Sequence, residues 1–389
     1  MYKKIRNITL VVIIAVVQLA CGGGSGSGKF IAVNHIAVDS TNDRLFMTEP
    51  SQRLFALTAS TLEDIAEEQP IVAEEVNEAI YALLPNVVTH LGAYTNGTSS
   101  RLFVMGSFKN SDGTYALNKI RVLDFDGTSF TQPSFSPITI SDGDEATDET
   151  DNTFAALLVD QENGVVYVTD SSDGQVYGFS ATDGSVVVGP MGIAGNPSGL
   201  ALDNGYLYVC NASNTEDEQL ITVYDVSDYA STTIDKDMPC THIAVKSNDT
   251  GTVMLVKRRD EQRVDIFSVD TATYDAATAI ASEASSLNDG YLTDSDGITS
   301  AINGIVLVVD TDDSFYGYLS EWDGNIEMLT INSNLNSYSL DTLSTSVTNI
   351  TEGSSLNTSS GAATTAYLIS EAGALISVAV GSTEVIVND

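Results

Sequence analysis

The chain has few basic residues and few of the residues on which catalysis and metal binding usually depend. Its 389 residues include 16 lysines and arginines against 53 aspartates and glutamates, with three histidines and three cysteines. A formal net charge of −37 repels nucleic acid and anionic lipid surfaces, so we expect neither as a partner. A Gly-x-Ser-x-Gly elbow, a His-Glu-x-x-His pair and a phosphate-binding glycine loop are absent from the sequence. The absences disfavour the enzyme classes that carry these motifs.

The first twenty residues have the pattern of a targeting segment. Lys3, Lys4 and Arg6 precede a short apolar stretch, residues 8–17, which is too short to span a bilayer. Gln18-Leu-Ala-Cys21 follows, and this resembles the lipobox of bacterial lipoproteins, with leucine one place later than usual. The resemblance implies that a signal peptide, 1–20, is removed and that Cys21 is acylated. The alternative is a plain secretory signal with an unused cysteine.

The residues after Cys21 favour the lipoprotein interpretation. Residues 21–29 contain five glycines and two serines, a composition typical of a flexible tether. Gly22, in place of aspartate, is what the family's sorting rule associates with the outer membrane. Residues 30–389 then form the folded domain. Within it only Cys210 and Cys240 remain, an even pair that could form one disulfide in an oxidising envelope.

A short apolar phrase that ends in a polar residue recurs along the domain. Successive copies of the phrase begin about 40 to 65 residues apart, a spacing typical of four-stranded propeller blades with insertions. Asn/Asp/Gly turns lie between alternating apolar runs, as in a β-meander. Seven phrases occur: 45–49, 102–106, 166–170, 207–211, 253–257, 306–310 and 367–371.

Two of these regions resemble known propeller repeats. Residues 166–170 (Val-Tyr-Val-Thr-Asp) are similar to the Tyr-Val-Thr-Asn repeat, and 197–203 (Pro-Ser-Gly-Leu-Ala-Leu-Asp) to NHL-type repeats. The resemblance implies an all-β, seven-bladed β-propeller. Residues 30–33 could close the ring as the outer strand of the last blade, which would remove a free sheet edge.

Two segments break the β pattern and predict short helical insertions. Ser60 and Glu63 form a capping box, and apolar residues from Val72 to Leu83 fall on one helical stripe. We therefore expect a helical insertion at about 61–84. An alanine-rich stretch, 274–287, predicts a second helix.

The three histidines occupy matching places at the start of the strand before the repeated phrase. His35, His90 and His242 lie 10 to 12 residues ahead of it, and Ala156 and Gly199 hold the same place in two other blades. That strand is the innermost one of a blade, so imidazoles from several blades could meet at the mouth of the axial channel and bind zinc or copper. Residues 239–242 are also similar to a Pro-x-x-His phrase of lactonase-type propellers. The alternative is a strand-entry position that tolerates any residue, which the substitutions by alanine and glycine favour.

Acidic and amide residues that end the phrases are the second candidate set. Carboxylate and amide oxygens at one level would suit calcium. The residues are Glu49, Asp170, Asn211, Asp310 and Glu371. The alternative is solvated turn residues in a very acidic chain.

The sequence therefore predicts an outer-membrane lipoprotein, facing the periplasm or the cell surface. Its propeller would bind or scaffold a protein, glycan or small ligand, with calcium as a candidate cofactor. The alternative is a lactonase-like or other metal-dependent hydrolase that uses the histidines and acidic residues of the channel. The two hypotheses differ in whether these side chains converge.

Overall fold

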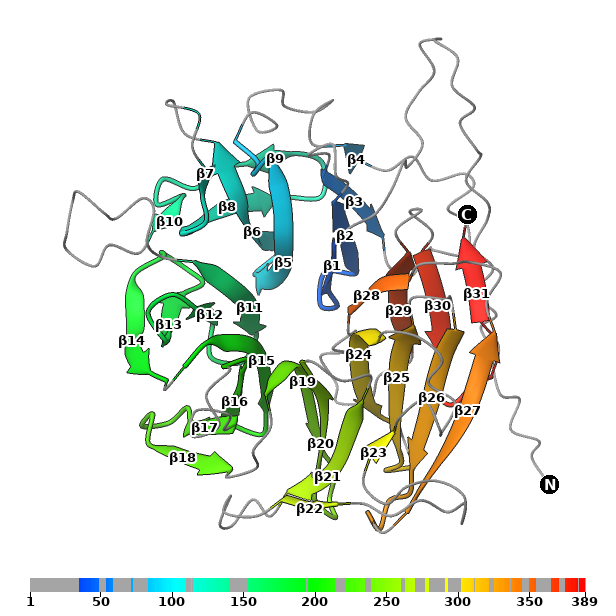
Figure 1. The fold of residues 1–389 in the computed structure, drawn as a ribbon. Coiled ribbons are helices and arrows are strands. Elements are labelled where there is room, and N and C mark those ends of the chain that lie inside the picture. Colours follow the sequence, from blue (N-terminus) through cyan, green and yellow to red (C-terminus); the bar gives the residue numbers. More distant parts are fainter. Residues whose placement is uncertain are drawn as a thin grey trace.

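The computed structural model describes the part of the chain that carries the sheets. The described residues are 35–48, 54–58, 71–72, 83–109, 113, 115–139, 153–193, 195–213, 221–234, 239–259, 263–269, 277–279, 291–292, 302–310, 312–321, 325–335, 337–344, 350–354, 365–370, 375–383 and 385–388. Their regular structure consists of antiparallel strands in chain order (Figure 1). The predicted signal peptide, 1–20, and the segment 21–29 lie outside these residues.

The N-terminal half of the chain forms four sheets, numbered here in chain order. Sheet one contains β1 (His35–Asp39), β2 (Arg44–Thr48), β3 (Leu54–Thr58) and β4 (Ile71–Val72). Sheet two contains β5 (Val87–Asn96), β6 (Ser99–Lys109), β7 (Tyr115–Ala116), β8 (Lys119–Phe125), β9 (Phe130–Thr131) and β10 (Ile138–Thr139). Sheet three contains β11 (Phe154–Asp160), β12 (Val165–Asp170), β13 (Gln175–Ser180) and β14 (Val186–Gly192). Sheet four contains β15 (Pro197–Asp203), β16 (Tyr206–Asn211), β17 (Ile221–Asp225) and β18 (Ser231–Ile234).

The C-terminal half adds three further sheets. Sheet five contains β19 (Cys240–Ser247), β20 (Thr252–Arg258), β21 (Val264–Val269), β22 (Ala277–Ala279) and β23 (Tyr291–Leu292). Sheet six contains β24 (Ile302–Val309), β25 (Phe315–Glu321), β26 (Asn325–Ile331) and β27 (Tyr338–Ser344). Sheet seven contains β28 (Ile350–Ser354), β29 (Thr365–Ser370), β30 (Leu375–Ala379) and β31 (Val385–Asn388).

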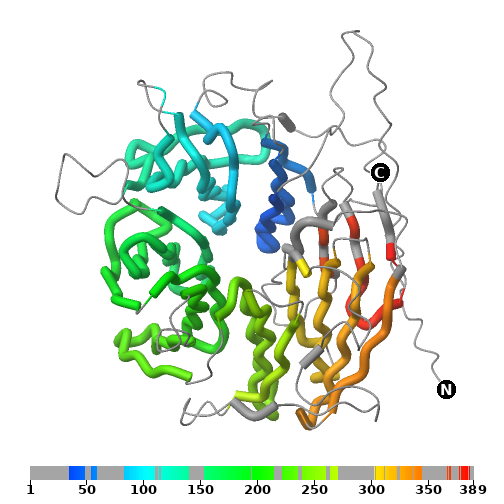
Figure 2. Tube along the Cα trace, in the orientation of Figure 1, coloured from blue at the N-terminus to red at the C-terminus, as the bar shows by residue number. Residues whose placement is uncertain are grey.

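The sheets stand around a common centre, with the first strand of each nearest to it (Figures 1 and 2). Successive first strands contact one another from β1 to β28, and β28 also contacts β1. This arrangement of meandering sheets around an axis is a β-propeller.

Apolar packing between neighbouring sheets holds the ring together. In β12 every residue is buried because both faces of the strand are covered. Val166 and Val168 pack toward sheet two, whereas Val165 and Tyr167 pack toward sheet four. Strands buried on both faces lose the polar alternation of a half-exposed sheet, which is why the repeated phrase is almost wholly apolar.

The predicted fold class needs two corrections. No helix occurs among the described residues, so the expected helical insertions are wrong where the structure describes them. Ile71 and Val72 form β4 and pair with Phe55 and Ala56, and β22 lies within the alanine-rich stretch. Pairing with an existing sheet edge has overridden the local helical pattern in both places.

The second correction concerns the predicted blade count of seven, because the packing between the sheets supports six blades. The buried apolar clusters of the described residues fill six spaces between neighbouring sheets, from the pair of sheets one and two to the pair of sheets six and seven. None of them joins sheet seven to sheet one. The outer position of sheet seven is held by β31, and residues 30–33, predicted for that place, lie outside the described residues.

A repeated turn connects the first and second strands at one end of the propeller. Asp39 caps the turn of sheet one, where its carboxylate accepts hydrogen bonds from the backbone amide and side chain of Asn42 at 3.2 and 2.9 Å. Asp160 does the same for Asn163 in sheet three, at 3.0 and 2.8 Å. We refer to this end as the turn end. The opposite end, where the first strands begin, is the mouth end.

Candidate functional site at the mouth end

The mouth end is built on one irregularity that recurs in sheets two to seven. The register of the first strand shifts near its start, between Val88 and His90 in sheet two and between Cys240 and His242 in sheet five. The residues that follow the shift are His90, Ala156, Gly199, His242, Gly304 and Glu352. His35 begins β1 at the same end. The predicted equivalence of three histidines with Ala156 and Gly199 is confirmed by the pairing.

The glycine at position 199 is explained by close packing. A Cβ atom added to Gly199 would lie 2.9 Å from the carbonyl oxygen of Thr241, in the first strand of the next sheet. The first strands of sheets four and five approach too closely there for a side chain. Packing around the ring therefore decides the residue in this blade, whereas the neighbouring blade has room for His242.

Two of the three histidines meet across sheets one and two. The rings of His35 and His90 are stacked, with centroids 6.3 Å apart and planes 17° from parallel. Nε2 of His35 lies 2.9 Å from the carbonyl oxygen of Val88. The pair therefore links the first strands of two sheets.

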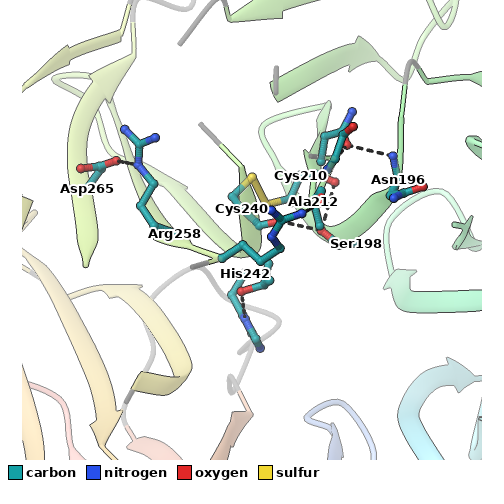
Figure 3. Close-up of a disulfide and its surroundings, with 12 residues drawn as sticks. Asn196, Ser198, Cys210, Ala212, Cys240, His242, Arg258 and Asp265 are labelled. Atoms are coloured by element: carbon teal, nitrogen blue, oxygen red, sulfur yellow. Dashed lines mark hydrogen bonds and ion pairs between the residues drawn. A yellow bond between two sulfur atoms is a disulfide. The ribbon is translucent and has the colours of Figure 1, made fainter. Parts of the chain in front are cut away.

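His242 does not join that pair. It lies on β19, beside the disulfide, and its Nδ1 is 3.0 Å from the hydroxyl of Thr241 (Figure 3). Within the described part of the chain, no group of three or more histidine, cysteine, aspartate or glutamate side chains could hold a metal ion. The mouth thus brings two of the predicted histidines together and keeps the third apart.

Asp170 and Asn211 share one role in the backbone. Oδ1 of Asp170 accepts hydrogen bonds from the amides of Thr153 and Ser172, each at 3.1 Å. Oδ1 of Asn211 accepts from the amides of Asn196 and Ser213, each at 2.9 Å. Both residues are buried, end the second strand of their sheet and bind the chain where it enters the first strand of the same sheet. Their oxygens bind backbone donors that would otherwise lack partners.

Asp310 does not lie at the same end as Asp170 and Asn211, so its predicted place beside them is wrong. It follows β24, the first strand of sheet six, and its amide bonds the carbonyl oxygen of Ser314 at 2.9 Å in a turn at the turn end. Glu321, at the end of β25, pairs with Ile302 and holds the equivalent place at the mouth end. The apolar phrase at 306–310 belongs to a first strand and not to a second strand. The acidic residue that ends it therefore lies at the turn end. Glu49 and Glu371 lie outside the described residues.

Cys210 and Cys240 form a disulfide between sheets four and five. Their Cα atoms are 5.7 Å apart, and the bond joins the end of β16 to the start of β19. Ser198 reinforces the joint because its hydroxyl donates to the carbonyl oxygen of Cys240 at 2.8 Å. The two cysteines therefore join neighbouring sheets at the mouth end.

The densest basic segment of the acidic chain lies beside this disulfide. Asp265 is fully buried and receives Nε of Arg258 at 2.5 Å and Nε of Arg263 at 2.6 Å. Arg259 reaches the carbonyl oxygen of Ala212 in sheet four. Figure 3 shows Arg258 turned toward Asp265, with His242 directed away from this ion pair. Sequence reasoning missed the cluster, although the run Lys257-Arg-Arg259 stands out in a chain of this charge.

Three large apolar side chains are exposed on an extension of sheet two at the mouth end. Val87 is 54%, Tyr115 53% and Leu117 36% exposed. Val87 pairs with Ser107, two residues before Lys109, which pairs with Tyr115. Because alternate residues of a strand share a face, Val87 and Tyr115 point the same way. Leu117 directly follows β7. We call Val87, Tyr115 and Leu117 the apolar row.

Comparisons with known proteins identify the fold and nothing finer. No family model matches the chain, and no curated protein matches it. Among solved structures, BamB from Moraxella catarrhalis is 13% identical, with 92% of this chain and 83% of that chain covered and a TM-score of 0.50. U3-55K (88% and 90% covered) and the WD40 repeats of RRP9 (88% of each chain) are both 10% identical, with TM-scores of 0.57. At such identities the likeness shows a shared propeller fold, on which many unrelated functions occur.

One further observation bears on how the chain relates to membranes. None of the described residues belongs to a helix with the length and apolar character needed to cross a bilayer.

Proposed function

We propose that this chain is an outer-membrane lipoprotein whose propeller binds a protein partner at the mouth end. The observation that carries the proposal is the apolar row, in which two of the three side chains are more than half exposed. Large apolar side chains gathered on one exposed face are typical of interaction sites. Tyrosine is also enriched among the residues that dominate binding energy in interfaces.

The surroundings of the apolar row suit binding better than catalysis. The row lies on the strand extension that contains Val87, three residues before His90. Burial of a side chain such as Val87 contributes about 1.5–3 kcal/mol. The hydrolase hypothesis required the histidines or the acidic residues of the channel to converge. His242 lies apart from the other two histidines, and Asp170 and Asp310 lie at opposite ends of the propeller. We therefore place the function in surface recognition.

Membrane attachment rests on the sequence. The basic residues, apolar stretch and Cys21 followed by a glycine- and serine-rich tether support acylation at that cysteine. Labelling cells with a palmitate analogue should mark the chain, and Cys21→Ser should abolish the label. Retention of the label in Cys21→Ser would contradict the anchor without affecting the binding proposal.

Substitution of the apolar row tests the binding proposal. The full chain would be isolated after mild crosslinking, and the protein that is co-isolated with it would be identified. The amount of that partner would then be measured for each variant. We expect the double variant Val87→Ser/Tyr115→Ser to lose that partner. The matched control is Val186→Ser/Val187→Ser, which removes two comparably exposed valines from β14 in sheet three. Equal loss in both double variants, or loss only in the control, would contradict the proposal.

A further inference from the structure

The apolar row lies on a three-stranded extension of sheet two whose backbone is held within the fold. Beyond Met105, the last residue of β6 that pairs with β8, the strand continues to Lys109. There β5 pairs with it on one side and β7 on the other. The amide of Lys109 donates to Oδ1 of Asn86 at 2.9 Å, and the amide of Asn86 donates to the carbonyl oxygen of Ser107 at 2.8 Å. A face fixed in this way loses little conformational freedom when a partner binds.

The inner face of the extension decides which side chains point outward. Phe108 and Ala116 pair with each other, and both are buried. The guanidinium of Arg121 covers the ring of Phe108, 5.6 Å from its centroid. Because side chains alternate along a strand, the next pair, Lys109 and Tyr115, points to the opposite face.

Lys109 adds a cation to this outer face. Its side chain is exposed, and it pairs directly with the exposed Tyr115. Directly opposed residues of two strands are close neighbours. Val87 pairs with Ser107, two residues before Lys109, so its side chain is on the same face. An ammonium group therefore stands beside the apolar row.

The charge of this part of the chain is opposite to that of the whole. Residues 101–121 contain four basic residues and one acidic residue, Asp112, whereas the formal net charge of the chain is −37. Arg101 binds Asp124 toward the turn end. Among the described residues of sheet two, acidic side chains occur only toward that end. The basic residues toward the mouth end are Lys109, Lys119 and Arg121.

The acidic residue of sheet three that lies close to the row is bound within the fold. Leu117 bridges to Thr153, whose amide donates to the carboxylate of Asp170. That carboxylate is buried and also accepts the amide and the hydroxyl of Ser172, at 3.1 and 2.6 Å. Exposed charges more than about 8–10 Å away are largely screened at physiological ionic strength. The acidity of the whole chain therefore does not decide what the extension binds.

We propose that the partner of the apolar row is a protein segment with an aspartate or glutamate beside its apolar side chains, and that this carboxylate pairs with Lys109. The inference rests on the proposed function, because it describes the partner of the same surface. Opposite charges across an interface fix its register and exclude wrong partners. Elsewhere on this acidic chain such a segment would meet like charge, which restricts it to the extension.

Carbodiimide crosslinking tests the contact itself. The reagent activates a carboxylate, and a lysine amine that touches it displaces the activated oxygen, which leaves as a urea while an amide bond forms. The full chain would be treated together with the partner protein that is co-isolated with it, and the linked peptides identified by mass spectrometry. We expect a link from Lys109 to an aspartate or glutamate of the partner. We expect none from Lys246, which lies at the turn end, 3.6 Å from Asp203.

Substitutions of Lys109 measure what its charge contributes to binding. Lys109→Met should weaken the affinity for the partner by about two- to fivefold, as expected for an exposed ion pair. Lys109→Glu should weaken it further, because it places like charges together. Lys109→Arg should keep the affinity and lose the carbodiimide link, because a guanidinium does not react. Lys246→Met is the matched control and should leave the affinity unchanged.

The outcomes separate this inference from the proposed function. Unchanged or stronger binding of the partner to Lys109→Glu, or a wild-type complex without a link from Lys109 to a partner carboxylate, would overturn the inference. If Val87→Ser/Tyr115→Ser still loses the partner in that case, the docking surface stands. If that double variant keeps the partner, the proposed function fails and the inference fails with it.

Discussion

The two ends of the propeller are built in different ways from the same strands. At the turn end, Asp39 and Asp160 make equivalent turns, and their carboxylates are filled by hydrogen bonds from within the fold. At the mouth end, equivalent places hold histidine, alanine, glycine and glutamate, and the side chains of the apolar row are exposed. Repetition at one end indicates a structural requirement. Variation at the other end indicates where this chain differs from a generic propeller and where we place its binding sites.

The disulfide joins sheets four and five covalently at the mouth end, and its removal should have the largest effect on stability. Cys210 and Cys240 are 30 residues apart, so their bond should contribute about 3–4 kcal/mol by limiting the unfolded chain. Urea unfolding of Cys210→Ser/Cys240→Ser, compared with wild type under oxidising conditions, measures this. The same comparison under reducing conditions is the control, in which the two proteins should agree. A difference below about 1 kcal/mol under oxidising conditions would contradict the expectation.

Substitution at the turn end should have the next largest effect. Asp39 is 1% exposed and, besides Asn42, accepts the hydroxyls of Thr95 and Ser100 in sheet two, each at 2.6 Å. Asp39→Ala leaves these donors buried without an acceptor, so we expect a loss of about 2–3 kcal/mol in unfolding free energy.

A turn aspartate at the surface is the control for Asp39. Asp228 accepts the amide of Ala230 in an exposed turn, so Asp228→Ala should change stability little. If the two alanine variants unfold at the same denaturant concentration, the network around Asp39 is not the structural link that we infer.

Substitution of the apolar row should abolish binding and leave stability almost unchanged. Val87→Ser/Tyr115→Ser removes exposed side chains, so its unfolding free energy should stay within about 0.5 kcal/mol per substitution of the wild-type value while partner binding is lost. Thermal unfolding beside the binding measurement separates the two effects. A large loss of stability in this double variant would mean that the row is part of the core and would remove the basis for the docking surface.

The smallest expected effect is a stabilisation at Lys257. Because burial lowers its pKa, the folded state binds fewer protons here than the unfolded state between the lowered pKa and the ordinary value of 10.5. The unfavourable contribution is complete below the lowered pKa and disappears as pH rises to the ordinary value. Lys257→Met should therefore be a few tenths of a kcal/mol more stable than wild type near neutral pH, and the gain should vanish above about pH 10.5.

That pH dependence is checked by unfolding both proteins across the range. A gain from Lys257→Met that does not change with pH would come from apolar packing alone. It would show that burial of the lysine carries no electrostatic penalty.

The two ends also differ in how far the sequence predicts them. The turn residues and the equivalence of His35, His90 and His242 with Ala156 and Gly199 follow from spacing, because the blade repeats its register. Asp310 was placed at the wrong end because the first strand of sheet six ends in an apolar run followed by an aspartate, the pattern that second strands have in other sheets. The helix predicted near Ile71 failed because pairing with β3 decided the local structure.

The features to which we assign binding could not be found by pattern. Val87 and Tyr115 are ordinary strand residues in the sequence, and only the extension of β6 beyond its neighbours leaves them exposed.

Photo-crosslinking in cells tests most directly the claim that binding occurs at the mouth end. A photoreactive amino acid would replace Tyr115 in one form of the chain and Val186, on the outer strand of sheet three, in another. The account predicts a discrete crosslinked protein from position 115 and none from position 186. A crosslink from position 186 alone, or from neither position, would contradict it.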